Sequence, residues 1–146
     1  MVPDESEART GWRCFDHTAD VGLEVWATDM HGLLEEAARA VAATMFDPGS
    51  VAEEREHEFA VEAEEREELL VAWLEEILYA FDADHFVTAR AVVNRLDDGV
   101  AEGILVGQDY DPARHEQLVS VKAVTYHDLQ IQESDRGLEV RIVLDA

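Results

Sequence analysis

The hydrophobic period changes along the chain, and this change limits the fold more than any other feature of the sequence. Residues 21–26 alternate apolar side chains with others, which is the period of a strand with one buried face. Residues 33–46 instead place apolar side chains at helical spacing, and the Asp-Pro-Gly at residues 47–49 ends that helix. The chain therefore begins as a mixed α and β fold.

The same two periods recur in the rest of the chain. Residues 56–62 predict a short strand, and residues 65–81 predict a second helix whose glutamate-rich face we expect to be solvated. After residue 84 only strand patterns remain, and they lie over residues 85–96, 100–110, 119–132 and 138–144. Strands with two helices set among them indicate an α+β fold in which both helices pack on a largely antiparallel sheet.

Length and composition set the size of the domain. With 146 residues, 47% of them hydrophobic, the chain can build one core but hardly two. We expect residues 1–11 to form a flexible tail and residues 12–146 to form a single domain. No apolar run approaches the roughly 18 to 20 residues that span a bilayer, so we expect a soluble, cytoplasmic protein without membrane contact.

The chain is strongly acidic. It has 34 acidic and 11 basic residues, a formal net charge of -23, and Lys122 as its only lysine. A chain this acidic that keeps a periodic apolar pattern is typical of a folded, halophilic protein, because molar salt reduces the Debye length to about 3 Å and screens the repulsion. The scarcity of basic residues argues against strong direct binding of nucleic acid.

Two aspartates near the ends of predicted strands could bind a metal ion. Asp20 precedes the first alternating segment, and Asp145 is the penultimate residue. With the backbone of Ala146 they would supply oxygen ligands, which suit calcium, magnesium or manganese. His17 joins them only if the chain turns at residues 18–19. The alternative is that Asp20 caps a turn through backbone amides and that His17 is a satisfied, partly buried side chain.

Further polar groups lie in residues 125–128, Thr-Tyr-His-Asp. On a strand, Tyr126 and Asp128 would share one face and His127 would lie on the other. An amphipathic strand without any site also explains this pattern. Lys122 lies next to the segment and could serve the same site.

Two other sets of reactive side chains have weaker patterns. Cys14 and His17 fall on opposite faces of a strand, so we expect Cys14 to be a small buried side chain rather than a nucleophile. As the only cysteine, it permits no internal disulfide and no cysteine-based zinc site. Asp109, Asp111 and His115 could form a loop site, although an Asp-Pro pair is also a common turn former.

Three sequence elements occur in a characteristic order: DHTADVGLEVWA at residues 16–27, VKAVTYHDLQI at residues 121–131, and an aspartate next to the last residue. Together they resemble the archease family over about residues 12–146. The resemblance implies a non-catalytic accessory protein of tRNA splicing. Such a protein activates the GTP-dependent RNA ligase of the RtcB type by promoting guanylylation of the ligase's active-site histidine and multiple turnover.

The resemblance also implies roles for particular residues. It implies a calcium site at Asp20, Asp145 and the backbone of Ala146, with His17 as a further candidate ligand. We expect the contacts to the ligase or to phosphate at Lys122, Tyr126 and His127. Archeases commonly end in a bulky aliphatic residue, whereas this chain ends in an alanine.

Two other functions remain open from the residues alone. A free-standing phosphoester hydrolase would place Asp20, Asp145 and His127 around one ion, and it would lose activity when the metal is removed. A non-catalytic adaptor would use its carboxylates only to hold the C-terminal tail. Metal removal would then loosen the tail and leave partner binding largely intact.

Overall fold

The computed structural model describes residues 10–17 and 20–146, and of Asp16 and His17 it describes the backbone alone. The predicted tail at residues 1–11 lies mainly outside this range, and Gly11 already begins the first strand. In the described residues, neither helix is both long enough and apolar enough to cross a membrane.

The strands form two antiparallel sheets. The five-stranded sheet has the order β1-β2-β8-β6, and β7 also pairs with β8. The three-stranded sheet has the order β3-β5-β4. The strands of the first sheet are β1 (Gly11–His17), β2 (Asp20–Ala27), β6 (Ala123–Val124), β7 (Gln132–Ser134) and β8 (Gly137–Asp145), and those of the second are β3 (Arg55–Glu62), β4 (Phe86–Asp97) and β5 (Val100–Asp109).

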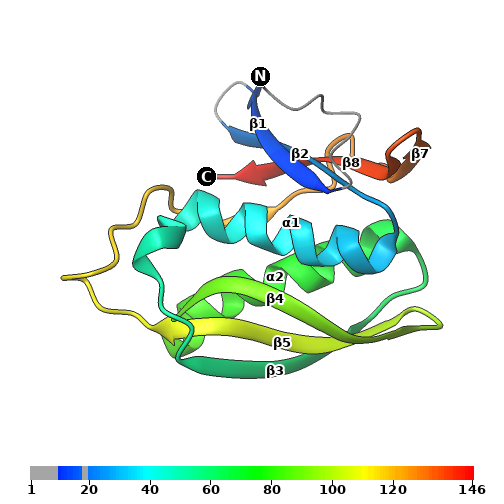
Figure 1. The fold of residues 1–146 in the computed structure, drawn as a ribbon. Coiled ribbons are helices and arrows are strands. Elements are labelled where there is room, and N and C mark those ends of the chain that lie inside the picture. Colours follow the sequence, from blue (N-terminus) through cyan, green and yellow to red (C-terminus); the bar gives the residue numbers. More distant parts are fainter. Residues whose placement is uncertain (1–9, 18–19) are drawn as a thin grey trace, which may run out of the picture.

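Two helices, α1 (Met30–Met45) and α2 (Arg66–Asp84), lie between the two sheets (Figure 1). α1 contacts β2 and β4, and α2 contacts β3, β4 and β6. Asp29 caps the start of α1 by accepting a hydrogen bond from the Gly32 amide at 2.8 Å. The chain leaves α1 at Phe46 through the short helix η2 (Pro48–Ser50), and His85, with a φ of 53°, ends α2.

The predicted α+β class is confirmed, and the helices pack on two sheets rather than one. The reason is visible in pairs of adjacent buried residues, which widen the apolar stripe of a helix until it covers two sides. The pairs in α1 and α2 are Leu33 with Leu34, Ala37 with Ala38, Leu69 with Leu70, Trp73 with Leu74, and Ile77 with Leu78. A helix with this pattern needs a partner layer on each side.

Trp73 joins the layers at the centre of the core. Its side chain is fully buried, and its Nε1–H donates to the Leu34 carbonyl of α1 at 3.0 Å. The ring of Phe59 on β3 lies 4.5 Å from the Trp73 ring, centroid to centroid. On β5, a Cβ added to Gly103 would come within 2.7 Å of the Trp73 ring, so the absence of a side chain there makes room for the indole.

Two strand predictions need correction. Cys14 and His17 were treated as residues of a strand, but the pairing of β1 with β2 along its whole length was not predicted. The strand predicted over residues 119–132 is wrong, because only β6 and the start of β7 pair with β8 in that range. Asp128 has a φ of 53°, and the Leu129 amide donates to the Tyr126 carbonyl at 3.1 Å. This turn interrupts the extended backbone that the sequence pattern indicated.

A buried hydroxyl on β4 gives a stability prediction. The Thr88 side-chain oxygen is buried and has no hydrogen-bond partner among the described residues. Thr88→Val keeps the shape of the side chain and removes the unsatisfied group, so we expect the free energy of unfolding to rise by about 1 kcal/mol. Chemical denaturation measures this change.

Thr44→Val is the matched control for this prediction. The Thr44 hydroxyl is also buried, but it donates to the Ala40 carbonyl at 2.9 Å. The control should therefore gain less stability than Thr88→Val or lose some. Equal effects of the two substitutions would contradict the account.

Candidate functional site

One row of residues crosses the end of the five-stranded sheet. His17 of β1 pairs with Asp20 of β2, and Val21 of β2 pairs with Leu144 of β8. Continuing the register of β2 and β8 by one residue places Asp20 opposite Asp145. Asp145 pairs in turn with Ala123 of β6. The two aspartates singled out in the sequence therefore come from opposite ends of the chain and lie on adjacent strands.

The two carboxylates of this row belong to the same face of the sheet, because directly opposed residues of antiparallel strands share a face. Their neighbours Val21 and Leu144 belong to the opposite face, where Leu144 is fully buried in the core. Asp145 and Ala146 are exposed, and Asp20 is half-buried. Carboxylate and backbone oxygens brought together at an exposed sheet end are a donor set that suits calcium.

The described side chains around the two aspartates add no third metal ligand. Among the side chains of residues 10–15 and 20–146, no three His, Cys, Asp or Glu are grouped to hold a metal ion. The His17 side chain and the expected turn at residues 18–19 lie outside the described part of the chain. Of the described side chains, two carboxylates, those of Asp20 and Asp145, lie in this row.

Lys122 and the end of β8 are joined through the backbone. The Lys122 amide donates to the Asp145 carbonyl at 2.7 Å, and the Thr125 amide donates to the Val143 carbonyl at 3.0 Å. The Lys122 side chain is exposed. The segment that carries the second sequence motif therefore begins beside the aspartate row.

Tyr126 and His127 lie in the turn that follows β6, rather than on the two faces of a strand. Both side chains are exposed, and 59% of Tyr126 is accessible to solvent. His127 Nε2 lies 3.2 Å from the carboxylate of Asp128. Because a turn replaces the strand, both residues are exposed on the surface.

Two glutamates of α2 hold this motif segment in place. Glu75 accepts a hydrogen bond from the Val124 amide at 3.1 Å, and Glu67 accepts one from the Ile131 amide at 2.9 Å. The expectation that the glutamate-rich face of this helix is only solvated is therefore wrong for these two residues. In a sheet, a neighbouring strand would accept hydrogen bonds from these backbone amides. Here the two glutamate carboxylates accept them instead.

Removing the Glu75 carboxylate should loosen the motif segment. We expect Glu75→Ala to lower the free energy of unfolding by about 1–3 kcal/mol, because a buried amide loses its acceptor. Glu75→Gln keeps an acceptor oxygen and should lose less. Hydrogen exchange at the Val124 amide provides the local measurement.

The exposed Glu68, on the same helix, supplies the control for this comparison. Glu68→Ala removes the same charge, and its effect should stay within about 0.5 kcal/mol. Unchanged protection of the Val124 amide in Glu75→Ala would show that the Glu75 carboxylate does not hold the segment in place.

The loop with Asp109, Asp111 and His115 is structural. His115 is buried, and its Nδ1 accepts a hydrogen bond from the Asp111 amide at 3.0 Å. Its Nε2 must then carry the proton, which it donates to Gln108 Oε1 at 2.8 Å. Asp109 forms an ion pair with Arg55. With both ring nitrogens of the histidine engaged inside the protein, the loop does not present a metal site.

Cys14 is exposed on β1, so the prediction of a buried cysteine is wrong. Among the described strands, β1 lies at the edge of its sheet and pairs with β2 alone. A position on the inner face of an edge strand can therefore remain open to solvent. The prediction considered the two faces of a strand but not its position at the edge of the sheet, which explains the error.

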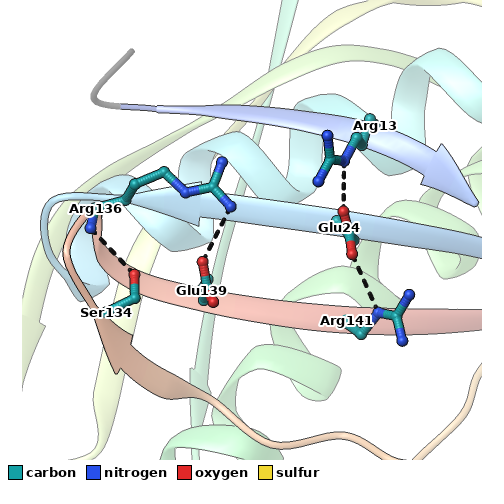
Figure 2. A network of polar contacts seen from close by, with 6 residues as sticks. All are labelled: Arg13, Glu24, Ser134, Arg136, Glu139 and Arg141. Atoms are coloured by element: carbon teal, nitrogen blue, oxygen red, sulfur yellow. Dashed lines mark hydrogen bonds and ion pairs between the residues drawn. The ribbon is translucent and has the colours of Figure 1, made fainter. Parts of the chain in front are cut away.

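Sequence reasoning also missed a network of arginines and aromatic rings on the outer face of the five-stranded sheet. Figure 2 shows Glu24 between Arg13 and Arg141, and Arg136 beside Glu139. The charged residues of β8 and the charged and aromatic residues of β1 and β2 are visible in the sequence, but the sequence does not reveal which strands pair.

The comparisons with known proteins agree with this fold. Residues 12–146 match the model of the Archease protein family. The chain is 36% identical to an archease of Methanopyrus kandleri, with 92% of this chain and 98% of the relative covered. It is 34% identical to an archease of Archaeoglobus fulgidus, with 92% and 98% covered.

Two solved structures are similar. Protein 1598 of Methanobacterium thermoautotrophicum has a TM-score of 0.77 and 30% identity, with 93% of this chain and 99% of that chain covered. An archease of Thermotoga maritima, described as a possible chaperone, has a TM-score of 0.65 over 90% and 94% of the two chains, and at 20% identity it supports the fold alone. Because residues 12–146 match the family model, and because relatives above 30% identity are covered almost completely, the chain belongs to the archease family.

Proposed function

We propose that this protein activates a GTP-dependent RNA ligase of the RtcB type in tRNA splicing. In this role it promotes guanylylation of the ligase's active-site histidine and lets the ligase turn over repeatedly, without catalysing a reaction of its own. Family membership supports the proposal. The observation that carries it is the register that brings Asp20 beside Asp145 at an exposed end of the sheet, next to the segment with Lys122.

We further propose that Asp20, Asp145 and the backbone of Ala146 hold a divalent cation, with calcium favoured over magnesium or manganese. His17 is a further proposed ligand, since its backbone pairs with Asp20. A bound cation would supply positive charge that neutralises phosphate oxygens. The two aspartates provide a one-sided donor set, which leaves room for oxygen atoms of a partner.

The contact surface of the proposed activator includes Lys122, Tyr126 and His127. All three side chains are exposed, and they lie on the segment that is hydrogen-bonded to the end of β8. Leu118, which is 53% exposed, lies a few residues earlier. In concentrated salt, exposed apolar groups such as Leu118 and Tyr126 would support the interface better than long-range charge attraction.

A multiple-turnover ligation assay tests this function. The RtcB-type ligase of the same organism is supplied in limiting amount with GTP and tRNA exon halves, in potassium chloride, with this protein present or absent. The proposal expects more joined product per ligase molecule when the protein is present. Equal product in both reactions would reject the activator function.

A second assay distinguishes the proposed activator from a phosphoester hydrolase. The protein alone is incubated with a chromogenic phosphodiester and calcium or manganese. The proposal expects no hydrolysis that is sensitive to chelation. Chelator-sensitive hydrolysis by the protein alone would favour an enzyme instead.

A further inference from the structure

Two aromatic side chains on the outer face of the five-stranded sheet lie across glycines of the neighbouring strand. Phe15 of β1 pairs with Gly22 of β2, and Trp26 of β2 pairs with Gly11 of β1. A Cβ added to Gly22 would come within 2.5 Å of the Phe15 ring, and one added to Gly11 would come within 2.5 Å of the Trp26 ring. Each ring therefore occupies the space that a side chain on the opposite glycine would need.

The Phe15–Gly22 pair lies directly beside the row that carries Asp20 and Asp145. Along β2, Gly22 is two residues from Asp20, and along β1, Phe15 is two residues from His17, whose backbone pairs with Asp20. Residues two apart on a strand share a face and lie about 7 Å from each other. The Phe15 ring thus lies on the same face as the Asp20 carboxylate, one cross-strand pair further into the sheet.

The same arrangement continues on β8. Gly22 pairs with Val143, which is two residues from Asp145 and only 3% exposed although it belongs to the outer face. Phe15 is partly buried, and the Arg141 guanidinium lies over its ring, 4.1 Å from the ring centre. An apolar strip made of Phe15, Gly22 and Val143 therefore borders the aspartate row toward the middle of the sheet.

An apolar border can act on a pair of carboxylates in two ways. It keeps water from one side of the row, and a cation is attracted more strongly where water is excluded. The ring also crosses from β1 to β2 near the end of one strand and the start of the other, so it fixes the position of Asp20 relative to β1. β1 needs such a contact, because no other described strand pairs with it.

We propose that Phe15 is a positioning residue of the cation site. Its ring, seated on Gly22, holds Asp20 in place opposite Asp145 and shields the two carboxylates from water on one side. The glycine is required because a side chain at position 22 would displace the ring. This inference rests on the proposed function, and specifically on its cation site, and it adds a residue that is not itself a ligand.

Calorimetric titration of the full-length protein with calcium, in potassium chloride, tests the inference. Phe15→Ala removes the ring, and Gly22→Ala places a methyl group where the ring lies. The backbone of Gly22 is not in the left-handed region, so it accepts alanine without strain of its own. We expect each substitution to weaken calcium binding about tenfold or more, as for other residues that orient metal ligands.

Combining the two substitutions shows whether they act through the same contact. Phe15→Ala leaves no ring to displace, so adding Gly22→Ala to it should change the calcium affinity by less than about twofold. Losses that multiply in the double variant would mean that the ring and the glycine act independently. That result would overturn the proposal.

Gly11→Ala is the matched control. It displaces the Trp26 ring between the same two strands and on the same face, but the Gly11–Trp26 pair lies at the opposite end of β1 from the aspartate row. The control should keep its calcium affinity within about twofold of the unmodified protein. Hydrogen exchange of the β1 and β2 amides without calcium should show faster exchange near Asp20 in Phe15→Ala, and near Trp26 in the control.

The titration separates failure of this inference from failure of the cation site. Equal calcium affinity in Phe15→Ala and the unmodified protein would overturn the inference and leave the cation site intact. An equal loss of affinity in Gly11→Ala would also overturn it, because a general loosening of the sheet would then explain the effect. Absence of calcium binding by the unmodified protein would reject the cation site, and this inference with it.

Discussion

Asp145→Asn is expected to reduce the stimulation of ligase guanylylation by more than about tenfold, because even residues that only support metal ligands cost about 10–100-fold when they are replaced. The substitution keeps the size of the side chain and removes its charge. It also leaves in place the Asp145 carbonyl, which accepts the Lys122 amide at 2.7 Å. The fold should therefore be retained while the proposed cation site is lost. Labelled GTP measures guanylylation, and calorimetric titration with calcium measures cation binding.

Asp98→Asn is the matched control for this prediction. Asp98 is exposed at the turn between β4 and β5, and its φ of 47° is one that asparagine also adopts readily. The control removes the same charge from the other sheet. It should therefore keep full stimulation. Loss of calcium binding in Asp145→Asn without loss of stimulation would show that the cation is structural, as in the adaptor alternative.

The largest effect on stability is expected for Trp73→Ala. This substitution empties the centre of the helix layer and removes the hydrogen bond to the Leu34 carbonyl. We expect the free energy of unfolding to fall by about 3–5 kcal/mol, as for other large-to-small changes in a core. That loss is a large share of the roughly 5–15 kcal/mol that stabilises a typical domain. Denaturation in potassium chloride, followed by circular dichroism, measures it.

Two further variants separate packing from hydrogen bonding at this position. Trp73→Phe retains most of the apolar contact with Phe59 and should lose less stability than the alanine variant. Tyr79→Ala, on the same helix but 61% exposed, should change stability by no more than about 0.5 kcal/mol. A loss below about 1 kcal/mol in Trp73→Ala would contradict the central role of this residue in the core.

The sequence predicted the fold best where the apolar period was long and regular. The α1 and α2 helices and the β4–β5 hairpin lie close to their predicted ranges. The division into two sheets was not predicted, because strand periodicity says which face is buried but not which strands pair. Adjacent buried pairs such as Leu33 and Leu34 were the available signal that each helix is covered on two sides.

Residues 119–132 show why the second motif was misread. Val124 and Ile131 are both buried, although they are seven residues apart and an unbroken strand would have placed them on opposite faces. The backbone that lies between them turns at Asp128. Glu67 and Glu75 provide acceptors for its amides from a distant helix, and no local pattern reports that.

For the candidate site, the sequence identified Asp20 and Asp145 as strand-end carboxylates. Only the pairing of β2 with β8 shows that they lie on adjacent strands. The buried His115 illustrates the opposite case. Its neighbours in the loop suggested a site, and its two internal hydrogen bonds show that it stabilises the loop instead.

Guanylylation of a matched RtcB-type ligase by radiolabelled GTP tests the central claim most directly. The reaction is run in potassium chloride under single-turnover conditions, with this protein present or omitted. The account predicts a faster transfer of label to the ligase when the protein is present, and no label on the protein itself. Transfer at the same rate in both reactions would contradict it.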